Sequence, residues 1–134
     1  MNDRGWVPSR VPGAPPKGAY SRAARAGGLL FISGQVPRSF ETGELMGTDV
    51  GSQTRAVIEN IARLLESEGL DLGDVVSVNA YLADIGAWGE FDAVYRLMMP
   101  PPYPTRTTVG AALHGVLVEM SVIAALKKKQ AVPK

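Results

Sequence analysis

The sequence predicts an α+β fold in which one mostly antiparallel sheet carries two helices on one face. Alternating apolar and polar residues mark strands, and two longer segments have apolar residues at helical spacing. These elements follow one another in the order β-β-α-β-α-β-β, for which a single sheet with both helices on the same side is the economical packing. The chain has 134 residues, enough for one compact domain with its own core.

The two ends of the chain differ in composition from the domain, which we place at residues 19–127. Residues 1–18 are rich in proline and glycine, so they cannot keep a regular ladder, and we expect an extended or disordered arm. Residues 128–134 form a basic tail, which we expect to be the solvated end of the last strand.

The first half of the domain begins with two strands and continues with a long helix. Residues 19–37 contain two strand-like runs on either side of Gly27-Gly28, a pair typical of a hairpin turn. After a loop, Thr48 and Asp49 offer N-cap chemistry for a helix of about 20 residues. Apolar residues at i, i+4, i+7 and i+8 from Val57 predict its buried stripe, and Gly69 is a typical C-cap glycine.

The middle of the chain predicts a third strand and a second helix. Residues 74–84 alternate, with Val76, Val78, Ala80 and Leu82 on one face. Residues 87–99 have apolar side chains at helical spacing, and Trp88 and Phe91 among them are expected in the core. The proline run that follows ends this helix.

Two further strands, at about 106–113 and 116–126, complete the sheet, joined by a turn at His114-Gly115 that leaves the histidine exposed. Alternation places Arg106 with Thr108 and Gly110 on one face of the first strand. In the second strand, Glu119 lies opposite a continuous apolar face. A carboxylate in so apolar a strand is costly to bury without a partner.

Arg106 and Glu119 allow two interpretations. They form a structural ion pair, or Arg106 binds the carboxylate of a ligand while Glu119 acts as general base or holds a water. Gly110 leaves room on the arginine's face, and Ser33-Gly34 is a second small, polar interruption of an apolar strand. Glycine within a strand often marks the close approach of a ligand, which favours the second interpretation.

Composition excludes several classes of function. The chain has no cysteine and one histidine, so we expect no disulfide, no thiol nucleophile and no metal site. A net charge of +1 argues against a nucleic-acid partner. No segment resembles a secretory signal or spans a bilayer, so the expected location is cytoplasmic, without membrane attachment.

Several blocks in the right order closely resemble the RidA/YjgF family of imine deaminases, also called endoribonuclease L-PSP-like. The blocks are GAYSRAARAGGLLFISGQVP, TGEL, QTRAVIENIARLLESEGLDLGDVV, PTRTTV and LVEMSVIA, which span about Gly18 to Leu126. The resemblance implies a chorismate-mutase-like fold and a homotrimer with sites in the clefts between subunits. Such a trimer would cover the sheet face that carries no helix, which must otherwise be polar.

The resemblance also implies an activity and its residues. The activity is the cofactor-free hydrolysis of reactive 2-imino acids of the 2-aminoacrylate type to 2-oxo acids and ammonia. Arg106 resembles the arginine that binds the substrate carboxylate, and Glu119 the carboxylate that positions the attacking water. Tyr20, Ser33 and Gly34 match the family's substrate-contacting residues.

Some positions depart from the family pattern. Thr108 stands where many members have cysteine, and Asp92 where many have asparagine; both are expected in the substrate site. Ser121 replaces a second glutamate, and the loops around the site are shortened. These changes bear on the substrate range more than on the fold.

A second hypothesis is a non-catalytic trimer that binds a small carboxylate metabolite or a protein partner. It needs Arg106 but not Glu119, and Asp92 favours it because an added negative charge in the cleft disfavours an anionic substrate. A ribonuclease is a third reading, against which the near-zero net charge and the lack of a basic, aromatic stripe argue.

Overall fold

The structure is a computed structural model that describes residues 3–9, 11, 13 and 15–127. The predicted basic tail at 128–134 lies outside the described residues. Within them the strands are β1 (Val7–Pro8), β2 (Ala23–Ala26), β3 (Leu29–Gln35), β4 (Val75–Leu82), β5 (Thr105–Gly110) and β6 (Val118–Ala125). The α-helices are α1 (Val50–Ser67) and α2 (Trp88–Met98), and short 3-10 turns lie at Leu72–Asp74 and Ile85–Ala87.

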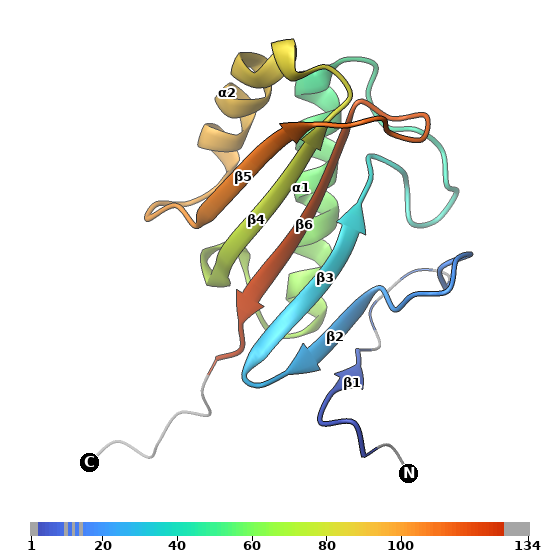
Figure 1. The fold of residues 1–134 in the computed structure, drawn as a ribbon, viewed down its shortest axis with the longest axis vertical. Helices are drawn as coiled ribbons and strands as arrows, with labels where there is room; N and C mark the ends of the chain where they lie inside the picture. The colour runs from blue at the N-terminus through green and yellow to red at the C-terminus, as the bar shows by residue number, and fades with distance from the viewer. Residues whose placement is uncertain (1–2, 10, 12, 14, 128–134) are drawn as a thin grey trace.

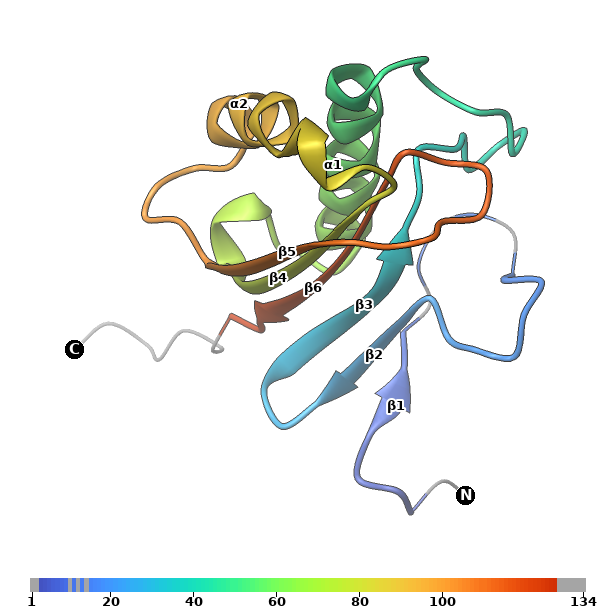
Figure 2. The same cartoon turned by 45° about the horizontal axis from the view of Figure 1, so that its top comes forward.

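The described strands form one sheet in the order β1-β2-β3-β6-β4-β5. Neighbouring strands are antiparallel except β4 and β5, which are parallel. Figure 1 and Figure 2 show both α-helices on the same side of this sheet, with the other side open. The predicted α+β class, with one mostly antiparallel sheet and two helices on one face, is confirmed.

The expected hairpin between the last two strands is wrong. The chain leaves β5 at the edge of the sheet, passes the His114-Gly115 turn and enters the sheet between β3 and β4 as β6. The segment α2 connects β4 to β5, and a crossover of this kind makes the two strands parallel. The edge position of β5 leaves Arg106 beside the crossover helix rather than beside β6.

Helix α1 has the ends that the sequence predicts. Asp49 is its N-cap and accepts a hydrogen bond from the backbone N–H of Ser52 at 2.8 Å. Gly69 has a φ of +73°, and the N–H of the next residue, Leu70, donates to the carbonyl of Leu65 at 2.9 Å. This returning bond satisfies a terminal carbonyl and brings Leu70 into the core.

The core lies between the helices and one face of the sheet. The largest fully buried side chains come from both layers: Phe91, Leu30, Ile58, Ile61, Leu64, Leu65, Leu82, Met120, Val57, Val78, Val118 and Thr54. Val76 was expected on this face but is 44% exposed. The pairing with β6 shifts between Val75 and Ser77, so that Val75 takes the buried position instead.

Two buried amides of α1 fix the loops that enter and leave the sheet. Gln53 accepts the N–H of Leu117 at 2.7 Å, just before β6. The Asn60 side chain donates to the carbonyls of Val36 and Arg38, at 3.1 and 2.9 Å, just after β3. Both amide side chains are buried, so these three hydrogen bonds anchor the loops to the helix.

The proline-rich arm contributes a strand that the sequence did not predict. Val7 pairs with Arg25 and Pro8 with Ala24, which places β1 at the outer edge of β2. Proline is tolerated there because an edge strand does not need every N–H.

Candidate functional site

Arg106 lies on β5, the edge strand of the sheet, and its side chain faces the helices. It lies opposite Val78 in the parallel ladder, and Val78 is buried under the helices. Its guanidinium Nη1 donates to Oδ1 of Asp92 on α2 at 2.9 Å. The guanidinium carbon is 4.5 Å from the centre of the Tyr95 ring and 5.3 Å from that of Trp88. The arginine is therefore held by one carboxylate and by aromatic faces that attract a cation.

Asp92 joins two arginines. Its other oxygen accepts from Nη2 of Arg96, one turn along α2, at 3.2 Å. The hydrogen bond from Arg106, with a smaller contribution from Arg96, holds the pKa of the Asp92 carboxyl below its usual range, against the opposing effect of burial. Arg106 thus forms an ion pair within its own chain, with Asp92 instead of Glu119, and its donors other than Nη1 make no ion pair with a described residue.

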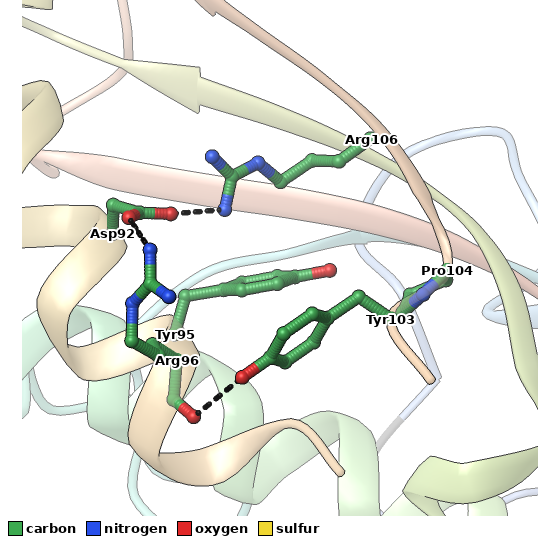
Figure 3. A pocket seen from close by; sticks show the side chains of 6 residues that line it. All are labelled: Asp92, Tyr95, Arg96, Tyr103, Pro104 and Arg106. Carbon is green, nitrogen blue, oxygen red and sulfur yellow. Dashed lines mark hydrogen bonds and ion pairs between the residues drawn. The ribbon is translucent and has the colours of Figure 1, made fainter. Parts of the chain in front are cut away.

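A cavity of about 310 Å³ opens beside this ion pair. Its lining consists of Asp92, Tyr95, Arg96, Tyr103, Pro104 and Arg106. Figure 3 shows the Asp92 carboxylate between the two guanidinium groups, with the two tyrosine rings beside them. Burial raises the pKa of the Tyr95 phenol, whose oxygen finds no hydrogen-bond partner among the described residues. The Thr108 hydroxyl, on the same face of β5, is likewise buried and unpaired within that part of the chain.

Glu119 lies on the opposite face of the sheet. It pairs with Tyr81 across β4, three positions beyond Val78, so its side chain points away from the helices. Burial raises the pKa of its carboxyl, and no hydrogen bond or ion pair to it is formed by the described residues. A carboxylate that is partly desolvated and unpaired is a stronger base than one in water.

Gly34 makes room for this carboxylate. A Cβ at position 34 would overlap the Glu119 carboxylate, so a larger residue there would force this side chain to move. The neighbouring Ser33 donates its hydroxyl to the carbonyl of Ser21 at 2.6 Å, which ties β3 to the segment that precedes β2.

A second cavity, of about 600 Å³, lies at the end of β3. Tyr20, Gly34 and His114 line it, together with the segments 15–18 and 38–43. Tyr20 is 58% exposed, and His114 is exposed as expected. We call this space the loop cavity.

The predicted site residues therefore form two separate groups. Arg106, Asp92 and Thr108 lie on the helix side, whereas Glu119, Gly34 and Tyr20 lie on the open side or in the loop cavity. The interpretation of Arg106 and Glu119 as an ion pair is wrong, because they project from opposite faces. The space predicted at Gly110 is also taken, since a Cβ there would lie 3.3 Å from Cβ of Ile85.

The sequence interpretation missed the aromatic wall around Arg106. Trp88 was expected in the core, but it is 45% exposed and lies against the guanidinium. Tyr95 and Arg96 follow Asp92 by three and four residues, a spacing that brings helical side chains together. The spacing could have predicted the pairing of Arg96 with Asp92, whereas the contact of Asp92 with Arg106 on β5 depends on the tertiary fold.

Comparison with known proteins places the chain in a family. A family model described as Endoribonuclease L-PSP matches residues 12–126. The chain belongs to this family, which is the RidA/YjgF family. A RutC family protein of Pyrococcus abyssi is 40% identical over 111 residues, which cover 81% of this chain and 87% of the relative.

Solved structures of the RidA/YjgF family share the fold. RidA from the Antarctic bacterium Psychrobacter sp. PAMC 21119 is 32% identical with a TM-score of 0.78, over 85% of this chain and 94% of that one. TdcF of E. coli, solved with bound serine, is 31% identical with a TM-score of 0.77, over 88% and 94% of the two chains. The family and the fold predicted from the sequence are both confirmed.

The described residues offer neither a cluster of metal ligands nor a membrane-spanning helix. They contain no group of three or more histidine, cysteine, aspartate or glutamate side chains that could hold a metal ion. Among the same residues, no helix is both long and apolar enough to cross a membrane.

Proposed function

We propose that the protein is a homotrimeric hydrolase that converts 2-imino acids to 2-oxo acids and ammonia without a cofactor. Each site would form between subunits, with the Arg106 side of one subunit facing the Glu119 side of the next. The observation that carries the proposal is the separation of these two groups on opposite faces of one sheet. Because each face carries only one of the two residues, Arg106 or Glu119, a second copy of the chain is needed to bring both to one substrate.

The open face of the sheet supports an interface between copies. Phe31 is 40% exposed and Val109 is 41% exposed, while the neighbouring Ile123 is only partly covered. Apolar side chains on a sheet face without helices are usually covered by another chain. Glu119 points from this same face, so an interface there would desolvate it further.

The helix side would bind the substrate carboxylate. Arg106 keeps donors that make no ion pair with a described residue, and the fork of a guanidinium matches a carboxylate. Tyr95 lines the cavity beside Arg106, and its hydroxyl, which has no hydrogen-bond partner among the described residues, can donate or accept a further hydrogen bond. Family membership supports the same assignment, and TdcF, a relative, was solved with the carboxylate-bearing serine.

The reaction needs one water and one proton acceptor. The Glu119 carboxylate accepts a proton from the water while the oxygen bonds to the carbon of the protonated imine, and the C=N π pair moves to nitrogen. Glu119 then returns that proton to nitrogen. The C–N bond breaks, nitrogen leaves with the bonding pair, and the hydroxyl proton passes to it as the carbonyl forms, which gives ammonium and the 2-oxo acid. Positioning and charge are the main contributions of the protein.

A direct assay tests the activity. A PLP-dependent serine or threonine dehydratase generates the 2-amino-enoic acid and its imine in situ, and release of the 2-oxo acid is followed with and without the protein. We expect acceleration that is lost in Arg106→Ala and in Glu119→Gln. It should survive in Arg55→Ala and Glu59→Gln, which remove the same charges from exposed positions on α1. Absence of acceleration with the unaltered protein would refute the proposal.

Mixed trimers test the location of the site. Arg106→Ala and Glu119→Gln chains are each expected to be inactive alone. In a co-expressed mixed trimer, about one interface in three would combine an intact Arg106 with an intact Glu119 from different chains. Restored activity supports a site between subunits, whereas none is expected if both residues act from the same chain.

One observation favours the alternative, a non-catalytic binder of a small carboxylate metabolite. Asp92 already occupies one end of Arg106 and repels an incoming anion. In that case the protein binds 2-oxobutanoate through Arg106, Glu119→Gln has no effect, and no imine is hydrolysed faster. The assay above separates the two functions.

A further inference from the structure

The loop cavity carries a positive charge that the proposed reaction does not use. Lys17, Arg22 and Arg38 line it, and Glu41 is the only carboxylate among its described lining residues. Glu41 is already bound to Arg63, outside the cavity, at 3.0 Å. The hydrogen bond from Arg63 is the largest cause that holds the pKa of the Glu41 carboxyl below its usual range. The cavity therefore has an excess of cations.

Arg38 is the cation best placed to bind a ligand. Its backbone carbonyl is held by the buried Asn60 at 2.9 Å, and its strand-like pairing with Leu45 fixes the other side of the loop. Its Nη1 donates to the carbonyl of Gly43 at 3.2 Å, which orients the guanidinium without neutralising it. No carboxylate of the described chain forms an ion pair with Arg38. An oriented guanidinium with free donors is a preorganised anion site.

Arg22, another cation of the cavity, is less suited to this role. Arg22 stacks on the Phe40 ring, with its guanidinium carbon 5.3 Å from the ring centre. Arg38 instead reaches toward the turn at His114-Gly115, where its Nη2 lies 3.5 Å from the place a Cβ of Gly115 would occupy. The exposed imidazole of His114 lines the same space and offers a further hydrogen bond.

The loop cavity adjoins the proposed reaction centre. Gly34 lines the cavity and also packs against the Glu119 carboxylate, which would hold the attacking water. Arg38 follows Gly34 by four residues, so their Cα atoms are at most about 14 Å apart, and both residues line this cavity. Tyr20 lines the same cavity. A substrate whose imine carbon lies at Glu119 would thus direct its side chain into a cationic space.

We infer that Arg38 selects imino acids with an acidic side chain, such as those derived from amino dicarboxylic acids, by binding the distal carboxylate in the loop cavity. This inference rests on the proposed function. It assigns the α-carboxylate to Arg106 of one subunit and the side-chain carboxylate to Arg38 of the other. A neutral side chain of the same length would leave the guanidinium of Arg38 without a partner.

A matched pair of substrates tests the inference. Amino-acid oxidases generate the imines of glutamate and of glutamine in situ, which differ only in the charge of the side chain. We expect the protein to hydrolyse the glutamate imine with a kcat/KM at least about tenfold higher, the factor expected of one charge-assisted hydrogen bond. In Arg38→Gln this preference should vanish through a higher KM for the acidic imine, while hydrolysis of the neutral imine is unchanged.

Control variants keep the test specific. Arg55→Gln removes the same charge from an exposed position on α1 and should keep the preference. Arg38→Lys keeps the charge and should retain part of it. Isothermal titration with the stable products gives a second readout: 2-oxoglutarate should bind more tightly than 2-oxopentanoate to the unaltered protein but not to Arg38→Gln.

The outcomes separate this inference from the function on which it rests. Equal hydrolysis of both imines, unaffected by Arg38→Gln, would overturn the inference and leave the hydrolase standing. A preference for the acidic imine that persists in Arg38→Gln would also overturn the role of Arg38. Hydrolysis of neither imine, with the dehydratase-generated imine still hydrolysed, would overturn the inference alone. Acceleration of no imine, the dehydratase product included, would remove the proposed function and this inference with it.

Discussion

Replacing Asp92 by asparagine should strengthen the binding of carboxylates at Arg106 while weakening the fold. Asp92 accepts from Arg106 at 2.9 Å, and both side chains are less than one fifth exposed. Asparagine has nearly the same shape and can still accept a hydrogen bond through its amide oxygen. The change therefore removes the negative charge and leaves the geometry largely in place.

The expected magnitudes follow from the positions of the charges. Two carboxylates on different edges of one guanidinium are about 6 Å apart, so at an effective dielectric constant of about 20 they repel by about 2.8 kcal/mol. Access of water to the cavity reduces this, and we expect about 1.4 kcal/mol, a tenfold gain in affinity. The loss of stability should be about 1–2 kcal/mol, between the values for surface and buried ion pairs.

The pH dependence of stability provides an internal check. Because Arg106 holds the pKa of Asp92 below its usual value, the pair stabilises the protein above that usual value and stops doing so as pH falls through the lowered one. The difference in the free energy of unfolding between the unaltered protein and Asp92→Asn should be constant near neutral pH. It should shrink in acid.

Calorimetry and urea unfolding measure both effects. Titration with 2-oxobutanoate gives the affinity of the unaltered protein, of Asp92→Asn and of Glu59→Gln, which removes the same charge from an exposed position on α1. If Asp92→Asn binds no more tightly than the Glu59→Gln control, Asp92 does not compete with the ligand for Arg106. The reasoning about this site is then wrong.

Further predictions concern the open face and the core. Gly34→Ala should displace the Glu119 carboxylate and reduce imine hydrolysis at least about tenfold, as initial rates will show; full activity would contradict the close packing of the two residues. Because burial raises the pKa of Glu119, stability should fall as pH rises from the usual glutamate pKa through the raised one. In Glu119→Gln, the free energy of unfolding measured with urea should no longer fall with pH over this range. An unchanged pH dependence would assign the effect to another group. Phe91→Ala empties a fully buried position and should cost about 3–5 kcal/mol by the same method, a value below about 1 kcal/mol being inconsistent with that burial.

Much of the fold was determined by local patterns in the sequence. The N-cap at Asp49, the turn at Gly27-Gly28 and the C-cap at Gly69 follow from the conformational preferences of single residues, and the structure bears them out. Alternation also placed Glu119 opposite the buried face of β6 correctly. Such patterns depend on neighbours within a few positions, so one sequence is sufficient to find them.

The order of the strands was decided only by the tertiary structure. Nothing local to β5 and β6 indicates that β6 enters between β3 and β4, because this depends on the α2 crossover and on pairings between distant segments. The same dependence explains Val76, which became exposed through a shift in the pairing with β6. Register between strands is a property of two segments together.

The sequence by itself singled out the two side chains on which the proposed chemistry depends, an arginine and a glutamate set in apolar strands. Only the tertiary structure decided that Arg106 and Glu119 project from opposite faces, and that Asp92 and Tyr95 of α2 surround the arginine. The physical reason is that alternation fixes the face of a side chain within its own strand. How the faces of two strands correspond is set by long-range packing.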